Sequence, residues 1–372
     1  MARVVLAMSG GVDSSVAALL LREQGHEVVG LFMRTGVEPE PSPRASHKQG
    51  CCSVIDAGDA RRVADRLDIP FYALDFAGDF GRVIDYFADE YLAGRTPNPC
   101  VVCNNWLKFG KLWSYGRQLG ADLIATGHYA RLTRRGVEVE LHRALDTAKD
   151  QSYVLAGLDR AILPRLLFPL GDLTKDRVRQ RAREAGLPVS DKPDSVEICF
   201  VPGGDHARVI RARRPESPRP GHFVDTEGNV LGEHDGIERF TVGQRKGLGI
   251  AAGERRYVLR IVPGANDVVL GDREGLLAGG LAAARVNWLL AEPPSAPLPC
   301  QVRIRYRHTP APGRVTALPG GGARVEFDEP QSAVTPGQLA VVYDGTRVLA
   351  GGWIEQALSP AAATRPPAAP VG

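Results

Sequence analysis

The chain has 372 residues, 44% of them hydrophobic and 24% charged, and a formal net charge of +3. This length and composition indicate two or three domains with full hydrophobic cores. A membrane-spanning helix requires about 20 consecutive apolar residues, and no apolar run in this chain approaches that length. The sequence therefore argues against an integral membrane protein. The six cysteines follow no secretion signal, because the short apolar start leads directly into a glycine loop, and they predict reduced thiols in the cytoplasm.

The net charge is spread unevenly along the chain. Residues 207–372 carry a net charge of +4, whereas residues 1–206 carry −1. A basic C-terminal half permits a nucleic-acid partner. The abundance of arginine, alanine, glycine and proline is also typical of a GC-rich genome, so charge alone does not identify the partner.

The first predicted strand starts near Val4 and runs into the loop Ser9-Gly10-Gly11-Val12-Asp13-Ser14-Ser15, which opens a helix. The two glycines let backbone N–H groups approach an anion, and the positive end of the helix points at the same place. The serine hydroxyls can add donors, and Asp13 can hold a magnesium ion that neutralises a polyphosphate. The pattern predicts a phosphate site, against the alternative of an ordinary turn between a strand and a helix.

The loop has neither the GxxxxGK[ST] pattern of Walker loops nor the GxGxxG spacing of dinucleotide folds. It resembles the SGGxDS loop of the N-type ATP pyrophosphatases, also called the PP-loop. Those enzymes cleave ATP between the α and β phosphates and leave AMP on a carbonyl oxygen.

Strand-like and helix-like segments alternate up to about residue 190, which predicts an α/β domain with a doubly wound parallel sheet. The predicted strands include 27–33, 70–74 and 123–127, and the predicted helices include 14–24, 57–67 and 108–119.

From about residue 220, short alternating segments separated by Gly/Pro turns predict one or two small β domains. The predicted strands there are 257–262, 302–307, 314–318, 324–327 and 339–343. We expect a catalytic domain over 1–206, a small β-rich domain over 207–275 and a C-terminal β-barrel over 276–358. The tail 359–372 is rich in Pro and Ala and is expected to be disordered.

A second candidate site is a pair of cysteines, Cys100 and Cys103, which lie just before the helix-like stretch that contains Lys108. A helix N-terminus favours the thiolate form of cysteine, and a pair with this spacing suits redox, zinc or iron–sulfur chemistry. Cys199 lies far along the chain in an apolar Ile-Cys-Phe triplet, where a buried structural cysteine is the alternative. Cys300, beside Pro299, is expected to be structural.

Seven motifs together resemble the tRNA-specific 2-thiouridylase family over nearly the whole chain, in the same order. They are SGGVDSS, GCCS at 50–53, RTPNPCVVCN, ATGHYAR at 125–131, KDQSYVL at 149–155, DSVEICF at 194–200 and FTVGQRKGLGI at 240–250. The family replaces the oxygen at C2 of the wobble uridine, position 34, with sulfur in tRNAs for Lys, Glu and Gln.

The resemblance implies a PP-loop catalytic domain of the adenine nucleotide alpha hydrolase type and a role for each matching residue. ATP would be bound by Ala7, Met8, Ser9, Gly10, Gly11, Val12, Asp13, Ser14, Met33 and Gly127. The target uridine, flipped out of its stack, would meet Asn98, Pro99 and Cys100. Further tRNA contacts would come from His128, Lys149, Asp150, Gln151, Arg305, Tyr306 and Gln338.

In that resemblance Cys103 is the nucleophile and Cys199 carries a persulfide, supplied by a sulfur-carrier or cysteine desulfurase protein. Adenylation makes the C2 oxygen a good leaving group, with magnesium absorbing charge. The persulfide sulfur then attacks C2 directly or leaves as sulfide, and either route ends in a Cys103–Cys199 disulfide that a reductant reopens. The two sulfurs are therefore expected to meet in at least one conformation.

A rival mechanism stays open, because Cys100, Cys103 and Cys199 can supply three thiolates to a [4Fe–4S] cluster. Cys51 and Cys52 are motif members without an assigned chemical role, and packing at a helix start is the simplest expectation for them. Two other classes are an ATP pyrophosphatase acting on a small molecule, which leaves the cysteines unexplained, and a non-catalytic RNA-binding protein.

Two arginine groups could meet phosphates. Arg303, Arg305 and Arg307 alternate, so on a strand they would share one face. A second group, Arg208, Arg211, Arg213 and Arg214, could form a patch near the sheet domain. Either group alone is more often a solvated surface than an RNA site.

Overall fold

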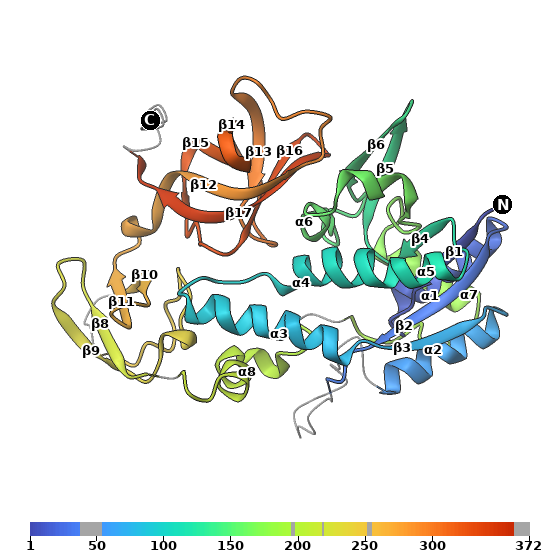
Figure 1. The fold of residues 1–372 in the computed structure, drawn as a ribbon, viewed down its shortest axis with the longest axis horizontal. Coiled ribbons are helices and arrows are strands. Elements are labelled where there is room, and N and C mark those ends of the chain that lie inside the picture. The colour runs from blue at the N-terminus through green and yellow to red at the C-terminus, as the bar shows by residue number, and fades with distance from the viewer. Residues whose placement is uncertain (38–53, 195–197, 218, 251–254, 361–372) are drawn as a thin grey trace. The chain divides into compact units, whose positions relative to one another are not determined.

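The computed structural model describes residues 1–37, 54–194, 198–217, 219–250 and 255–360. The chain divides into two compact units (Figure 1). The first comprises Met1–Ile84, Pro99–Asp205 and Thr346–Val348, and the second comprises Asp85–Asn98, His206–Gly345 and Leu349–Gly372. Cys51 and Cys52 lie outside the described residues, as does nearly all of the predicted tail.

The first unit is built on a five-stranded sheet in the order β3-β2-β1-β4-β7, with every neighbouring pair parallel. Its strands are β1 (Arg3–Ala7), β2 (Glu27–Arg34), β3 (Phe71–Asp75), β4 (Leu123–Thr126) and β7 (Leu166–Leu167). The chain builds outward from β1 to β3 on one side and continues through β4 on the other. Between β1 and β4 the strand order reverses, and ligands of such sheets bind there, at the carboxyl ends of the strands.

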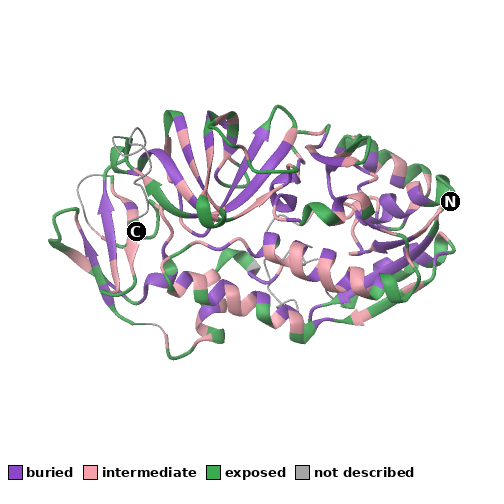
Figure 2. Ribbon diagram, turned by 45° about the horizontal axis from the view of Figure 1, so that its top comes forward, coloured by how far each residue is buried: buried purple, intermediate pink, exposed green. Residues whose placement is uncertain are grey.

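Helices cover both faces of this sheet, which confirms the predicted doubly wound fold. Val4 and Leu6 of β1 belong to a core shared with helices α1 (Val12–Glu23), α2 (Val54–Arg66) and α7 (Lys175–Glu184). Val5 points to the opposite face, where it meets Gly116 of α5 (Trp113–Gln118). Figure 2 shows these central strands as the most buried part of the unit.

The remaining elements of the first unit are short, apart from helix α3 (Ala77–Leu92), whose first half, to Ile84, belongs to this unit. They are α4 (Pro99–Val102), the π-helix η1 (Cys103–Leu112), the hairpin β5 (Ala130–Arg135) and β6 (Glu138–Arg143), α6 (Ser152–Leu155), and the 3₁₀ helices η2 (Arg160–Arg165) and η3 (Pro202–Gly204).

The second unit begins its C-terminal part with α8 (His206–Arg213) and a four-stranded sheet in the order β10-β11-β8-β9. The strands are β8 (Gly221–Val224), β9 (Val230–His234), β10 (Tyr257–Val262) and β11 (Asp267–Gly271), with η4 (Ile237–Arg239) between them. Phe223, Phe240 and Val258 are buried in a small core of their own. The small β domain predicted from the turn-rich sequence is confirmed.

The unit also contains a closed six-stranded barrel in the order β12-β15-β14-β13-β16-β17, closed by pairing of β12 with β17 (Figure 1, orange to red). Its elements are η5 (Glu274–Leu276), β12 (Leu277–Trp288), β13 (Leu298–Arg303), β14 (Ala311–Leu318), η6 (Pro319–Gly321), β15 (Gly322–Ser332), β16 (Leu339–Asp344) and β17 (Arg347–Leu358). Cys300 packs against the barrel core, and burial raises the pKa of its thiol to about 12, as expected of a structural cysteine.

Several predicted elements differ from the structure in their bounds; the strand predicted over 324–327, for example, is β15, which spans 322–332. Two of the differences have a clear physical form. The helix expected over 108–119 begins as a π-helix at Cys103 and becomes α-helical at Trp113. The strand expected over 302–307 ends at Arg303, because the following residues turn and the Arg303 guanidinium donates to the carbonyls of Tyr306 and His308.

Among the described helices, none combines the length and apolar character that a membrane span requires.

Candidate active site

The loop after β1 has the backbone that its two glycines predict. Gly10 has a φ of +72°, and a Cβ on this residue would overlap the backbone carbonyl oxygen of Asp56. Gly11 is the N-cap of α1, so the first N–H groups of the helix point toward the loop. The loop therefore presents backbone donors at the carboxyl end of β1, where a phosphate can be held.

The serine hydroxyls bond within the loop and the first turn of the helix. The Ser14 hydroxyl accepts from the Ser9 backbone N–H at 3.1 Å and lies 3.3 Å from the Ser9 hydroxyl. Ser15 is fully buried and donates to the Gly11 carbonyl at 2.9 Å. The Ser14 hydroxyl also donates to the Gly11 carbonyl, at 3.1 Å, so both hydroxyls shape the first turn of the helix. That these serines donate to a phosphate stays a prediction.

The other side of the site is formed where β4 ends. A Cβ on Gly127 would lie 2.8 Å from the Ser14 backbone nitrogen, so only a glycine lets the two loops approach this closely. Met33, at the end of β2, and Met8 are both buried beside the same edge of the sheet. These positions are compatible with the predicted nucleotide pocket.

Asp13 is held by a lysine and a tyrosine that the sequence reasoning did not single out. The Lys175 ammonium donates to both carboxylate oxygens, at 2.7 and 2.9 Å, and the Tyr129 hydroxyl donates to Oδ1 at 2.7 Å. Burial and the charge of Asp13 raise the pKa of Tyr129, so its hydroxyl remains a donor. These bonds use three of the four acceptor sites of the carboxylate.

The fourth acceptor site of the Asp13 carboxylate is left for a metal ion. Asp13 could therefore be the one protein ligand of Mg²⁺, which often takes its other ligands from phosphates and water.

The described cysteines are not arranged to hold an iron–sulfur cluster. Among the described residues, which include Cys100, Cys103 and Cys199, no group of three or more His, Cys, Asp or Glu side chains is arranged to hold a metal ion. The three cysteines thus do not fit the predicted [4Fe–4S] alternative in this structure, and we assign no step to a cluster.

Lys192 stabilises the loop by binding both the loop and helix α2. Its ammonium donates to the Gly10 carbonyl at 3.0 Å and to Asp56 and Asp59 of α2 at 2.6 and 2.5 Å. Burial opposes the charge, but these two carboxylates outweigh it and raise the pKa of Lys192. Neither Lys175 nor Lys192 belongs to a motif quoted from the sequence. The only local signal was Thr174, an N-cap residue immediately before Lys175.

The two predicted sulfur-handling cysteines are half-buried and lie in segments that contact the same part of α3. Cys103 begins η1, where Trp106 stacks under the Arg82 guanidinium at 4.2 Å and Lys111 pairs with Asp79. Cys199 precedes Phe200, whose ring packs against Phe80 with 5.7 Å between centroids. Cys100 is exposed and Pro99 is buried. That the two sulfurs meet stays a prediction.

The predicted tRNA-contacting residues of the first unit mostly serve its own structure here. His128 is buried, its Nδ1 lies 2.7 Å from the Thr126 hydroxyl, and burial lowers its pKa well below the usual value. Asp150 is buried and accepts from the N–H groups of Ala144 and Ser152. Gln151 accepts from the Tyr129 backbone N–H at 2.9 Å. Lys149 differs, because it is partly exposed and paired with Asp194.

In the second unit, Gln338 holds the segment that leads to Asn98. Its side-chain amide donates to the carbonyls of Thr96 and Pro97, at 3.0 and 3.2 Å. The Thr96 N–H donates to the Pro336 carbonyl at 2.8 Å. Gln338 therefore positions the chain just before the predicted uridine-binding residues, and its contact with tRNA stays a prediction.

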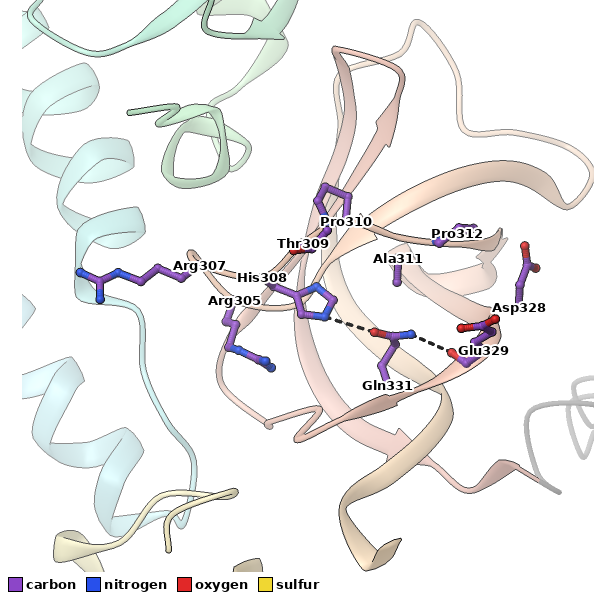
Figure 3. A pocket seen from close by; sticks show the side chains of 10 residues that line it. All are labelled: Arg305, Arg307, His308, Thr309, Pro310, Ala311, Pro312, Asp328, Glu329 and Gln331. Atoms are coloured by element: carbon purple, nitrogen blue, oxygen red, sulfur yellow. Dashed lines mark hydrogen bonds between the residues drawn. The ribbon is translucent and has the colours of Figure 1, made fainter. Parts of the chain in front are cut away.

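Arg305 lies at the rim of an open groove of about 640 Å³ in the barrel (Figure 3). The figure shows Arg305 and Arg307 directed apart, so the predicted three-arginine ridge is wrong, because the strand ends at Arg303. His308 donates from Nε2 to the Gln331 side-chain oxygen at 3.2 Å. Arg305 and Tyr306 are exposed, as a contact with tRNA requires.

The second arginine group is largely neutralised within its unit. Arg211 pairs with Glu238 and Asp235, and Arg213 and Arg214 both pair with Asp85 of α3. The expected basic patch is therefore mostly a set of ion pairs that tie α8 to its neighbours.

Three family models match the chain in succession. They are the tRNA methyl transferase HUP domain over residues 2–203, the tRNA methyl transferase PRC-barrel domain over 208–272 and the aminomethyltransferase beta-barrel domain over 278–354. The first alone covers more than half of the chain, and together they follow the parallel-sheet unit, the small β sheet and the barrel.

Curated relatives match along all or nearly all of their length. The chain is 50% identical over 399 residues to the tRNA-specific 2-thiouridylase MnmA of Rhodopirellula baltica, covering 99% of this chain and 100% of that protein. It is 50% identical to the protein of the same name from Geotalea uraniireducens, covering 96% of each chain. The Chloroflexus aggregans protein of that name is 48% identical, covering 95% of this chain and 98% of its own.

Solved structures match only distantly. A 4-thiouridine synthetase in complex with RNA and bound ATP has a TM-score of 0.36 at 16% identity, covering 58% of this chain and 54% of that one. The NMN synthetase from Francisella tularensis has a TM-score of 0.33 at 17% identity, covering 56% and 75%. Similarity this low supports no argument about the site.

Proposed function

The chain belongs to the tRNA-specific 2-thiouridylase family, and we propose that it catalyses the ATP-dependent 2-thiolation of a tRNA uridine. The observation that carries the proposal is the 50% identity to a 2-thiouridylase over 99% of the chain. That span includes the nucleotide loop and the segments of Cys103 and Cys199. A small-molecule ATP pyrophosphatase would not need these cysteine segments or the barrel.

In the proposed reaction, the loop after β1 holds the phosphates of ATP through its backbone donors and the hydroxyls of Ser9 and Ser14. Asp13 is the residue that would hold Mg²⁺, which when bound neutralises the triphosphate. The C2 oxygen of the uridine attacks the α phosphorus, and pyrophosphate leaves. The adenylated oxygen then departs readily as AMP, which makes C2 open to sulfur.

Sulfur arrives as a persulfide on Cys199. In one route, the Cys103 thiolate attacks the inner sulfur of the persulfide, releases sulfide and forms a Cys103–Cys199 disulfide; the sulfide then displaces AMP from C2. In the other route, the terminal sulfur attacks C2 first and Cys103 then breaks the S–S bond. Both routes leave the same disulfide, which a thiol reductant reopens with two electrons.

The proposed substrate is the wobble uridine 34 of tRNAs for Lys, Glu and Gln, and the proposed sulfur donor is a sulfur-carrier or cysteine desulfurase protein. Both tRNA and reducing thiols are available in the cytoplasm, which is the proposed location.

The test is mass analysis of nucleosides from unmodified glutamate tRNA after incubation with anaerobically purified protein, ATP, Mg²⁺ and a persulfide donor. We expect 2-thiouridine from the wild type, none from Cys103→Ser or Cys199→Ser, and wild-type amounts from the control Cys300→Ser. Cys300 is a suitable control because it packs against the barrel core, in the other unit from Cys103 and Cys199.

The iron content of the same samples separates the two sulfur mechanisms. Thiolation by iron-free protein supports the persulfide route, whereas thiolation only with iron would contradict it. Pyrophosphate release without tRNA and without 2-thiouridine would overturn the proposal in favour of a small-molecule substrate.

A further inference from the structure

Tyr129 connects the end of strand β4 to the nucleotide loop that follows β1. It comes three positions after the last residue of β4, and its hydroxyl donates to Oδ1 of Asp13, 116 positions earlier, at 2.7 Å. β1 and β4 are neighbouring parallel strands, so both segments leave the sheet at the same edge. Tyr129 is 2% exposed, whereas the side chain of Asp13 is 34% exposed. The tyrosine therefore contacts the carboxylate from the protein interior, and the rest of the carboxylate stays accessible.

The backbone of Tyr129 is itself fixed by one residue. Its N–H donates to the side-chain oxygen of Gln151 at 2.9 Å, and its carbonyl accepts from the Gln151 backbone N–H at 2.8 Å. The Lys175 ammonium lies 5.8 Å from the centre of the tyrosine ring. A buried side chain whose backbone is held in this way has a defined position, as a residue that orients a ligand requires.

The two donors that hold Asp13 differ in charge. The Lys175 ammonium donates to both carboxylate oxygens, at 2.7 and 2.9 Å. An ammonium and a divalent cation repel each other, so Lys175 competes with a metal ion for this carboxylate. A phenol hydroxyl is uncharged at physiological pH and adds no such repulsion. Tyr129 is therefore the donor that can keep Asp13 oriented while a metal ion is bound.

We propose that Tyr129 is a positioning residue for the metal ion that accompanies the nucleotide, because its bond to Oδ1 directs Oδ2 of Asp13 toward that ion. The inference rests on the proposed function. Without the hydroxyl, the carboxylate is held mainly by the competing ammonium of Lys175. Loss of the hydroxyl should thus weaken the part of nucleotide binding that depends on the metal ion. The part that comes from the backbone donors of the loop should remain.

The test compares the affinity of α,β-methylene ATP in EDTA with its affinity in excess Mg²⁺, by isothermal titration calorimetry. The ratio of the two affinities measures what the metal ion adds. Tyr129→Phe keeps the ring beside Lys175 and removes only the hydroxyl. We expect it to lower the ratio about tenfold or more, the usual cost of losing a partner that orients a metal ligand, and to leave the affinity in EDTA unchanged. Asp13→Asn, the reference for loss of the ligand, should lower the ratio at least as far.

Tyr115→Phe is the matched control, because it removes the same hydroxyl from an exposed side chain of α5 in the same unit. It should leave the ratio unchanged. An unchanged ratio in Tyr129→Phe would overturn the inference, and so would equal losses of affinity with and without the metal ion, which a merely structural role produces. A wild-type ratio near one would also overturn it, because Asp13 would then hold no metal ion.

A second variant covers the case in which Tyr129→Phe does not fold. Gln151→Leu removes the acceptor of the Tyr129 N–H and leaves the hydroxyl in place. It should lower the ratio by less than loss of the hydroxyl does, and a ratio equal to that of the wild type would then count against the inference.

The analogue cannot be cleaved between its α and β phosphates, so this assay is independent of the thiolation assay. Thiolation by the wild type together with an unchanged ratio in Tyr129→Phe contradicts only the positioning role. A lowered ratio without thiolation by the wild type contradicts only the proposed function.

Discussion

Gly10 and Gly25 both have positive φ, but only one of them lies against another backbone. Gly10, with φ +72°, abuts the Asp56 carbonyl of α2, whereas Gly25, with φ +80°, has nothing within 4 Å of where a Cβ would lie. The Gly10 carbonyl is in turn bound by Lys192. The position of the phosphate loop therefore depends on how closely it packs on α2 as well as on the freedom of glycine.

This difference makes Gly10→Ala a specific probe of the loop. Both Gly10→Ala and Gly25→Ala force an alanine into the left-handed region, at a cost of about 1–2 kcal/mol in the free energy of unfolding. Only Gly10→Ala also pushes the loop away from α2, so we expect it to weaken binding of an ATP analogue about tenfold or more, the cost of misplacing a preorganised site. Calorimetry with both variants checks this, and equal affinities would show that the close packing is unimportant.

The residues that the sequence did not predict share a physical reason. Asp13, Ser9 and Gly127 lie in short motifs whose chemistry can be read locally. Lys175 acts through carboxylates more than 150 positions before it and 19 positions after it. No local pattern encodes such a partnership, because it arises only when α7 packs beside α1.

Elements whose hydrophobic residues recur with a regular period were predicted well. Elements whose bounds or partners depend on other segments of the chain were not. The strand predicted over 257–262 has the bounds of β10, and β2 begins at the predicted residue. The π-helix η1 was not predicted, because apolar spacing does not distinguish its start from that of an α-helix. Arg213 and Arg214, at the end of α8, were interpreted as part of a patch, because their acidic partners on α3 lie about 125 positions earlier.

The pairing of α8 with α3 predicts a pH dependence of stability. The Arg213 guanidinium, opposed by partial burial and aided by Arg214, lowers the pKa of Asp85 from 3.8 to about 2. Because the folded-state pKa is lowered, the pair stabilises the fold above pH 4, and this stabilisation is lost as the pH falls from about 4 to about 2. Screening at a carboxylate that is 31% exposed limits the contribution to about 1 kcal/mol.

Urea unfolding of the wild type and Asp85→Asn at a series of pH values measures this contribution. The difference in the free energy of unfolding should be constant from about pH 5 upward and should shrink toward zero near pH 2. The control Asp344→Asn removes an exposed carboxylate at the end of β16 and should give no such trend. A difference that is independent of pH would mean that the ion pairs do not stabilise the folded state.

At the scale of the whole chain, the sequence predicted the parallel-sheet fold, the small β sheet and the barrel, because each has its own periodicity and turn chemistry. The residues predicted to contact tRNA come from both units. Pro99, Cys100, His128, Lys149, Asp150 and Gln151 belong to the first, and Asn98, Arg305, Tyr306 and Gln338 belong to the second. The contribution of the barrel to tRNA binding can therefore be tested by substitutions in the second unit alone.

Arg305→Glu provides that test. Arg305 is exposed at the rim of the groove in Figure 3, and its side chain donates to the Ser332 carbonyl, 3.2 Å away. If Arg305 contacts a phosphate, the charge reversal weakens tRNA binding. It also lowers the slope of log affinity against log salt concentration by about 1 or more.

Arg314→Glu is the matched control, because it makes the same charge change at an exposed site on β14 that does not line the groove. Filter binding of glutamate tRNA at several salt concentrations distinguishes the two variants. Equal affinities and slopes would place the tRNA contact of the barrel elsewhere, because a charge reversal that acts only through the net charge of the unit affects both variants alike.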